Sequence, residues 1–148
     1  NVCISDKIFL KPYKLNEEEY ANIKKHSGKG AKILSAITLF NDVVPIVRSH
    51  HEWIDGRGYP DGLKGDAIPE ESKIIAVADS FDAMTSHRHY RSNLSLAQAL
   101  DELRRGKGTQ FAPEVVDAFL EMLDEMGEEK AMEKYGTGKA VEEEGENE

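Results

Sequence analysis

Three histidines and one aspartate have the residue types and spacing of metal ligands. His50 and His51 are adjacent at the end of a predicted helix, about 100° apart around its axis, so they can approach one site from two directions. His26 lies at the end of another predicted helix, and Asp79 lies within the most apolar one. A carboxylate in apolar surroundings is costly unless it is paired, hydrogen-bonded or bound to a cation. From these residues alone, a metal site and a set of structural side chains are equally open interpretations.

The ligand types indicate which ion such a site would prefer. Three imidazoles and one carboxylate suit Mn, Fe, Ni or Zn better than the all-oxygen preference of Ca or Mg. Asp82 follows Asp79 by one helical turn and shares its face. Arg88 and Arg91 come just after this helix, at a spacing that suits two phosphate oxygens. Taken singly, these three residues are also compatible with an exposed acid and two surface arginines.

The elements that must position these side chains are predicted to be helices. Asn16 and Glu19 form a capping-box pattern that starts a helix, and we expect this helix to end near Gly28. A second helix is predicted over residues 30–39, and Asp42 is expected to cap a third that leads to the adjacent histidines. The glycine-rich stretch that follows is expected to be a loop.

The second half of the chain also has helical periodicity. The helix expected over residues 70–86 is apolar on most faces, which predicts the buried centre of the domain. Ser95 with Gln98 predicts a capped helix ending at Gly106, and Pro113 begins the last one. The sequence has no alternating strand pattern. We therefore expect an all-α fold.

Composition limits the class of protein. The chain has 148 residues, 39% hydrophobic and 32% charged, which suits one globular domain. No apolar run is long enough to span a membrane, and a single cysteine, Cys3, favours a cytoplasmic protein. The net charge is −9, but residues 124–148 contain ten acids and three lysines, a net of −7. We expect a domain over residues 1–126 and an acidic, flexible tail over residues 127–148. The sequence shows no basic face of the kind that nucleic-acid binding requires, so we do not expect nucleic acid as a partner.

A string of motifs, read together, resembles the signature of HD-GYP domains. The resemblance covers about residues 1–123 in one register. Its residues are His50-His51-Glu52, Asp55-Gly56, Gly58-Tyr59-Pro60, Gly62-Leu63, Gly65, Ile68-Pro69, Val77-Ala78-Asp79, Phe81-Asp82-Ala83, Thr85-Ser86, Arg88, Tyr90-Arg91, Phe111 and Pro113, with Leu10-Lys11-Pro12, Lys14-Leu15 and His26 upstream.

HD-GYP domains are all-helical, metal-dependent phosphohydrolases that cut cyclic di-GMP to a linear dinucleotide or to GMP. The resemblance implies two or three divalent transition-metal ions, with Fe or Mn favoured over Ni or Zn. The implied metal ligands are His26, His50, His51 and Asp79. The residues implied to contact the nucleotide are Asp82, Arg88 and Arg91. The loop Gly58-Tyr59-Pro60 is implied to shape the mouth of the site and to contact partner proteins, especially cyclic di-GMP synthase domains.

The family's His-Asp pair is not found in the sequence. We expect this pair just upstream of Asn1 in a parent protein, so that the present chain is an N-terminally truncated HD-type domain. Because the Asp of the pair bridges metals in the family, we expect the chain alone to be poorly active, and no catalytic residue is separable from the metal ligands. Two alternatives remain open. One is a degenerate, non-catalytic module that binds nucleotide or protein, and the other is an HD-type phosphohydrolase acting on another nucleotide.

Overall fold

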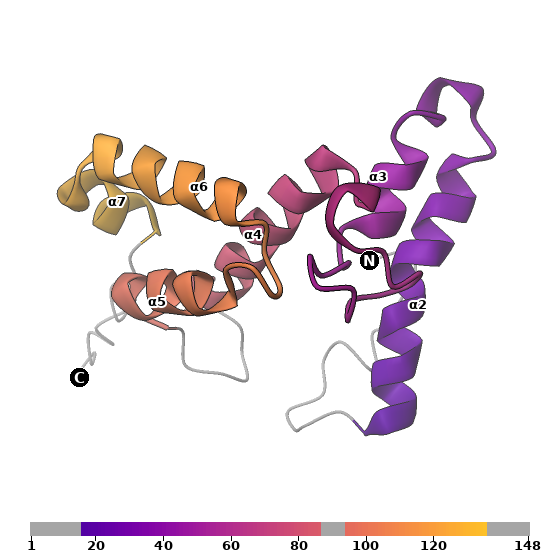
Figure 1. Cartoon of the computed structure of the whole chain (residues 1–148), viewed down its shortest axis with the longest axis horizontal. Coiled ribbons are helices and arrows are strands. Elements are labelled where there is room, and N and C mark those ends of the chain that lie inside the picture. The colour runs from indigo at the N-terminus through magenta and orange to yellow at the C-terminus, as the bar shows by residue number, and fades with distance from the viewer. Residues whose placement is uncertain (1–15, 87–93, 136–148) are drawn as a thin grey trace, which may run out of the picture.

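The computed structural model describes residues 16–86 and 94–135 (Figure 1). Within these residues the chain is helical and has no strand, so the all-α prediction is confirmed. The elements are α2 (Glu17–Leu34), η1 (Thr38–Phe40), α3 (Val44–Ser49), η2 (Gly65–Ala67), α4 (Glu70–Thr85), α5 (Leu96–Gly106), α6 (Pro113–Met126) and α7 (Glu128–Tyr135).

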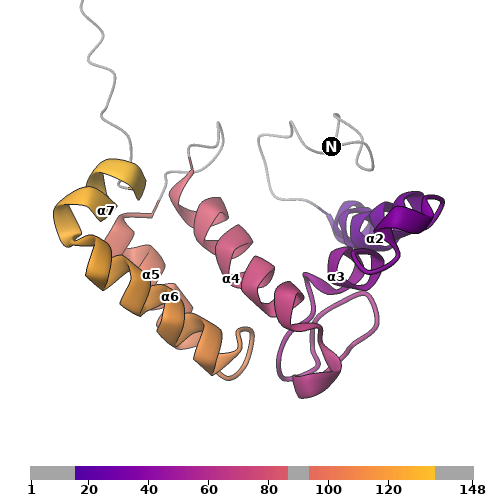
Figure 2. The same cartoon turned by 90° about the horizontal axis from the view of Figure 1, so that it is seen from above.

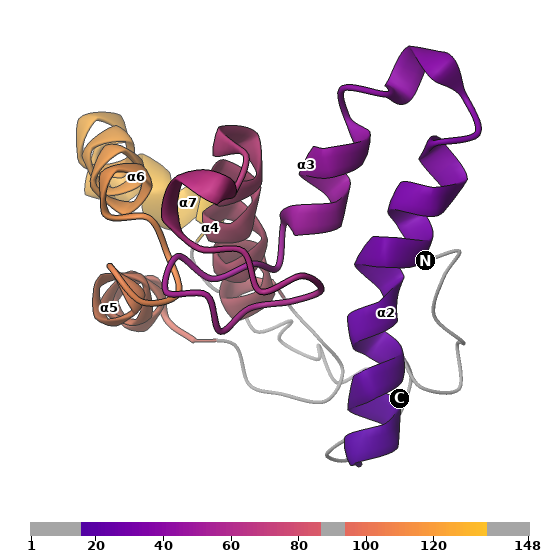
Figure 3. The same ribbon diagram turned by 45° about the vertical axis from the view of Figure 1, so that its right-hand side comes forward.

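The helices are arranged in two groups joined by α4. Helices α2 and α3 lie side by side, and α5, α6 and α7 lie on the opposite side of α4 (Figure 2, Figure 3). Helix α4 contacts α3 on one side and both α5 and α6 on the other. The loop between α3 and α4 therefore lies between the two groups.

Helix α2 begins where predicted but is longer than predicted. The Asn16 side chain accepts from the Glu19 N–H at 2.8 Å and the Glu19 carboxylate accepts from the Asn16 N–H at 3.0 Å, which confirms the capping box. The predicted break near Gly28 is wrong, because α2 continues to Leu34. A Cβ at Gly28 would make an ordinary contact, 3.4 Å from a side-chain nitrogen of Arg48 in α3.

Helix α3 is short and begins without a side-chain cap. Its N-cap is Val43, so the prediction that Asp42 caps this helix is wrong. The chain turns through η1 before reaching α3, and Val43 itself donates to the Phe40 carbonyl at 2.9 Å. Helix α3 ends with His50 at its C-cap, as expected for a helix that leads to the two adjacent histidines.

The hydrophobic core lies among α4, α5, α6 and α7. Val77 and Phe81 of α4 pack with fully buried side chains of α5 and α6, including Leu103 and Val116. The prediction that α4 is buried on most faces is wrong, since Ile74 is 52% exposed. Only one stripe of α4 faces the core, because α5 and α6 lie on the same side of it.

Helices α5 and α6 begin where predicted, and an additional helix, α7, follows them. Ser95 and Gln98 form the predicted capping box of α5, which ends at Gly106. Pro113 opens α6, whose N-cap has no side-chain hydrogen bond. The first part of the predicted flexible tail instead forms α7, because Tyr135 packs edge-on against Phe81 with ring centroids 5.4 Å apart. Residues 136–148 lie outside the described part of the chain.

Neither of the two described stretches contains a helix with both the length and the apolar character needed to cross a membrane.

Candidate metal centre

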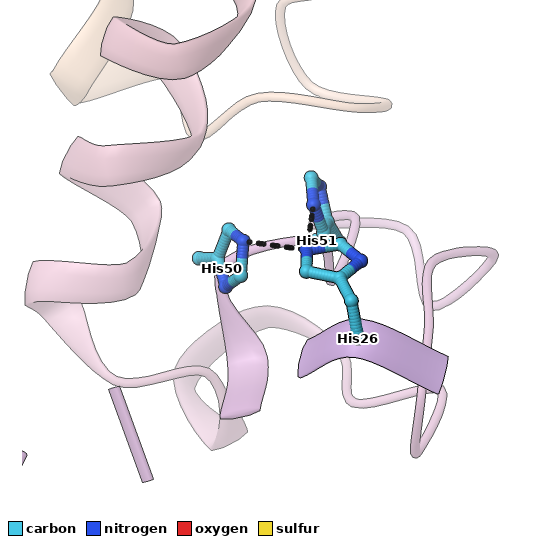
Figure 4. A group of neighbouring side chains, drawn as sticks. All are labelled: His26, His50 and His51. Atoms are coloured by element: carbon cyan, nitrogen blue, oxygen red, sulfur yellow. Dashed lines mark hydrogen bonds between the residues drawn. The ribbon is translucent and has the colours of Figure 1, made fainter. Parts of the chain in front are cut away.

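Three imidazole side chains converge between α2 and the end of α3 (Figure 4). His26 comes from the middle of α2, His50 caps the end of α3, and His51 follows it. The Nε2 atom of His26 lies 3.1 Å from Nε2 of His51 and 3.4 Å from Nε2 of His50. One candidate ligand atom from each ring lies within 4.8 Å of the others. The three residues therefore have the spacing required to surround one cation.

Backbone carbonyls fix which nitrogen of two rings carries hydrogen. Nδ1 of His26 lies 2.6 Å from the Ile23 carbonyl, and Nδ1 of His50 lies 2.7 Å from the Val47 carbonyl. A carbonyl oxygen only accepts, so each Nδ1 must donate, and each Nε2 of the neutral ring carries a lone pair. Two lone pairs that face each other at 3.4 Å repel, and a bound cation removes that repulsion. The donor set thus fits a divalent transition metal.

The protonation state of His51 also suits a ligand. Burial, followed by the neighbouring charges of His50 and His26, lowers its pKa to about 3. The ring is therefore neutral near pH 7, which is the form that binds metals.

Asp79 and Asp82 both lie on α4 and are exposed, so the expectation that Asp79 is buried in apolar surroundings is wrong. The structure does not bring the Asp79 carboxylate into the cluster formed by the three histidines. The Asp82 carboxylate accepts from the Ser86 hydroxyl at 2.7 Å. Arg88 and Arg91 lie outside the described residues. The roles expected for these four residues, a metal ligand at Asp79 and nucleotide contacts at the other three, stay predictions.

Tyr59 connects the loop to the histidines. Its ring stacks on that of His51, with centroids 4.9 Å apart and an interplanar angle of 28°. Its N–H donates to the His51 carbonyl at 3.1 Å. Burial, then Tyr20, then Asp79, raises the pKa of the Tyr59 phenol to about 12. The charge of Asp79 therefore acts on the ring that covers His51, although its carboxylate is not in the cluster.

Glu52 holds the loop in place from beneath. It is only 3% exposed, and its carboxylate accepts from the N–H groups of Asp61, Gly62 and Leu63 at 2.7, 3.1 and 3.0 Å. Three hydrogen bonds to one carboxylate compensate for the loss of hydration. From the sequence, Glu52 was predicted only as part of the motif string, without a structural role. An acid directly after two candidate ligands and before a glycine-rich loop is the signal that could have indicated this role.

Two further features determine the path of the loop. Arg48 forms a two-point ion pair with Asp61, with both N–O distances 2.7 Å, and this pairing lowers the pKa of Asp61. At Gly58, a Cβ would lie 2.2 Å from the Trp53 nitrogen and 2.5 Å from the Glu52 Cα. Only glycine permits so close an approach of two backbone segments. The Tyr59–Pro60 peptide bond is cis.

The site is also joined to the second group of helices. The Ser72 hydroxyl of α4 donates to the Ile46 carbonyl of α3 at 3.0 Å. The Asp55 N–H donates to the Thr109 carbonyl, in the turn before α6, at 3.0 Å. The first bond thus ties α4 to α3, and the second ties the loop to the turn before α6.

Comparisons with known proteins identify the family of the chain. A model of the HD domain family matches residues 4–115. A cyclic di-GMP phosphodiesterase of Thermotoga maritima is 42% identical over 135 residues, which are 90% of this chain and 37% of that protein. A cyclic di-GMP phosphodiesterase response regulator of Xanthomonas campestris is 44% identical over 121 residues, 80% of this chain and 32% of that protein.

A 3′3′-cGAMP-specific phosphodiesterase of Vibrio cholerae is 41% identical over 126 residues, 84% of this chain and 24% of that protein. The chain therefore spans little more than a third, or less, of the length of these relatives. Two solved structures share the fold. One is a cyclic GMP-AMP specific phosphodiesterase of V. cholerae, with TM-score 0.62 and 24% identity, covering 79% of this chain and 27% of that one. The other is a protein of Bdellovibrio bacteriovorus, with TM-score 0.63 and 20% identity, covering 79% of this chain and 37% of that one.

The chain belongs to the HD domain family, and its motif string makes it a domain of the HD-GYP type.

Proposed function

We propose that the protein is a metal-dependent phosphodiesterase that hydrolyses cyclic di-GMP to the linear dinucleotide or GMP. The observation that carries the proposal is the convergence of His26, His50 and His51, in which the Nε2 lone pairs of His26 and His50 face each other at 3.4 Å. Relatives named as cyclic di-GMP phosphodiesterases support the substrate. The protein is proposed to act in the cytoplasm.

The proposed ligands are His26, His50, His51 and Asp79, for two or three ions of Fe or Mn, with Ni or Zn as alternatives. Divalent cations at this position would supply Lewis-acid activation of water and would offset phosphate charge. His26 and His50 are held for this role by the hydrogen bonds from their Nδ1 atoms to carbonyls of their own helices. For Asp79 to bind metal as well, α4 would have to lie closer to the three histidines, or a second ion would have to bind away from their three nitrogens.

The remaining site residues are assigned to the nucleotide. Arg88 and Arg91 are proposed to contact the phosphates, since guanidinium groups bind phosphate oxygens in pairs. Asp82 is proposed to accept from a base edge. The loop Gly58-Tyr59-Pro60 is proposed to form the mouth of the site and a contact for cyclic di-GMP synthase domains.

The first test is metal binding by the chain itself. We expect purified protein to bind Mn²⁺ or Fe²⁺ stoichiometrically, as measured by elemental analysis and competition titration. His51→Ala should abolish binding because it removes one of three convergent nitrogens, whereas His87→Ala, which removes a histidine that is not among the predicted ligands, should bind as the wild type does. Equal loss in both variants would contradict the ligand assignment.

The second test is hydrolysis. Offered cyclic di-GMP with Mn²⁺ or Fe²⁺, the chain should release linear dinucleotide or GMP, detected by chromatography, slowly because the His-Asp pair is not in its sequence. The identity to a 3′3′-cGAMP-specific relative, 41%, makes this cyclic dinucleotide the second candidate substrate. Faster turnover of 3′3′-cGAMP would replace cyclic di-GMP in the proposal. Stoichiometric metal without any product would instead favour a non-catalytic binding module.

A further inference from the structure

Lys24 of α2 lies between two aromatic rings at the edge of the metal site. Its Nζ atom is 4.7 Å from the ring centroid of Tyr20, one turn earlier on α2, and 5.5 Å from that of Tyr59. An ammonium group this close to a ring face is attracted by the negative potential of the ring. Since Tyr20 belongs to α2 and Tyr59 to the loop after α3, the ammonium group joins the two segments.

Within residues 16–86 and 94–135, Lys24 forms no ion pair, unlike Lys73 and Lys107, which contact carboxylates. The adjacent Lys25 turns elsewhere and donates to the Asn22 side chain at 3.3 Å. In this part of the chain the Lys24 ammonium group therefore interacts with the two tyrosine rings.

The position of Tyr59 matters because its ring covers His51. Other connections of the loop bind the Tyr59 N–H to the His51 carbonyl, residues 61–63 to Glu52 and Asp61 to Arg48. These contacts hold the backbone at Tyr59 and beyond it, whereas the direction of the Tyr59 side chain depends on contacts of its ring. The Tyr59 ring itself interacts with the Lys24 ammonium group of α2 and stacks on the His51 ring.

We propose that Lys24 is a positioning residue, which holds the Tyr59 ring against His51 and so fixes the His51 imidazole in its orientation towards His26. Lys24 acts through Tyr59 and does not touch the reacting atoms. Its consequence for metal affinity rests on the proposed function, whereas its effect on the two rings does not. The two effects are therefore measured separately.

The direct test uses the metal-free chain. In wild-type protein, NMR should show nuclear Overhauser contacts between the Tyr59 and His51 rings, and an upfield ring-current shift of the His51 protons. Lys24→Met keeps an unbranched side chain without charge and should weaken both signals. Lys24→Arg should retain them, because a guanidinium also binds ring faces. Lys25→Met, which removes the same charge one residue away, should leave them unchanged.

The second readout is metal affinity. Lys24→Met should weaken Mn²⁺ or Zn²⁺ binding about two- to fivefold, the effect expected from losing one exposed cation–π contact, while Lys25→Met should not. Ring contacts that are undiminished in Lys24→Met, or that weaken equally in Lys25→Met, would overturn the positioning role. A wild-type chain that shows the ring contacts but binds no metal would overturn the proposed function and leave the positioning of Tyr59 supported.

Discussion

Glu52 places a buried negative charge at the centre of the loop, directly after the two adjacent histidines. Its three hydrogen bonds all come from backbone N–H groups, those of Asp61, Gly62 and Leu63. Hydrogen bonds to a charged acceptor are stronger than those between neutral groups, and a buried donor that loses its acceptor costs additional free energy. The stability of the loop should therefore depend on the charge of this one side chain.

We expect Glu52→Gln to lower the free energy of unfolding by about 1–3 kcal/mol, because the amide removes the charge and turns an NH₂ group towards backbone donors. Chemical denaturation measures the change, and metal titration of the same variant should show weaker binding. The matched control is Glu121→Gln, on the exposed surface of α6, which should alter stability little. Indistinguishable stability of the two variants would contradict the role assigned to Glu52.

At the same scale, the sequence predicted some of the site and missed the rest for identifiable reasons. The adjacency of His50 and His51 is a local property, and the structure places His26 beside them as predicted. The position of Asp79 depends on how α4 approaches α3, which no local pattern determines. The three donors to Glu52 lie nine to eleven residues further along the chain, so its role as acceptor depends on the path of the loop.

At the scale of elements, the glycines in α2 do not break the helix. A Cβ at Gly30 would make an ordinary contact, 3.5 Å from a Val47 methyl group. Gly28 predicted the end of the helix, but α2 continues past it and packs against α3. Both capping boxes, at Asn16 and Ser95, were predictable because they depend on residues only three positions apart.

We expect Gly30→Ala to stabilise the protein by up to about 1 kcal/mol, since alanine favours the interior of a helix over glycine and the site has room for one methyl group. Thermal and chemical denaturation measure this gain. Gly58→Ala should have the opposite sign, because its Cβ would lie 2.2 Å from the Trp53 nitrogen. Destabilisation by Gly30→Ala would show that α2 and α3 pack more tightly than the structure indicates.

At the scale of the whole molecule, stability is unevenly distributed. The main hydrophobic cluster is drawn from α4 to α7 and adjoining residues, and none of its buried members comes from α2 or α3. In α2 and α3 only Ser27, Ala31 and Ser49 are buried. Within the described residues, the two helices that carry the histidines therefore bury few side chains completely, and local opening should begin there.

Hydrogen exchange followed by mass spectrometry tests this distribution. Without metal, amides of α2 and α3 should exchange faster than those of α5 and α6. Metal at a hundred times its dissociation constant should slow α2 and α3, because binding to the closed form stabilises it by about 2.7 kcal/mol. His26→Ala should show no slowing. Equal protection of all helices on adding metal would contradict the division into two groups.

The three backbone N–H groups around Glu52 form an anion-binding site, and the bound anion, the Glu52 carboxylate, belongs to the same chain. Because the carboxylate is tethered, its local concentration is set by chain geometry and does not depend on the surrounding solution. Buried charges are also screened far less than exposed ones. In concentrated salt the exposed ion pair between Arg48 and Asp61 should weaken, while the hydrogen bonds to the buried Glu52 carboxylate should remain. The loop should therefore keep its shape across salt concentrations at which surface ion pairs no longer contribute.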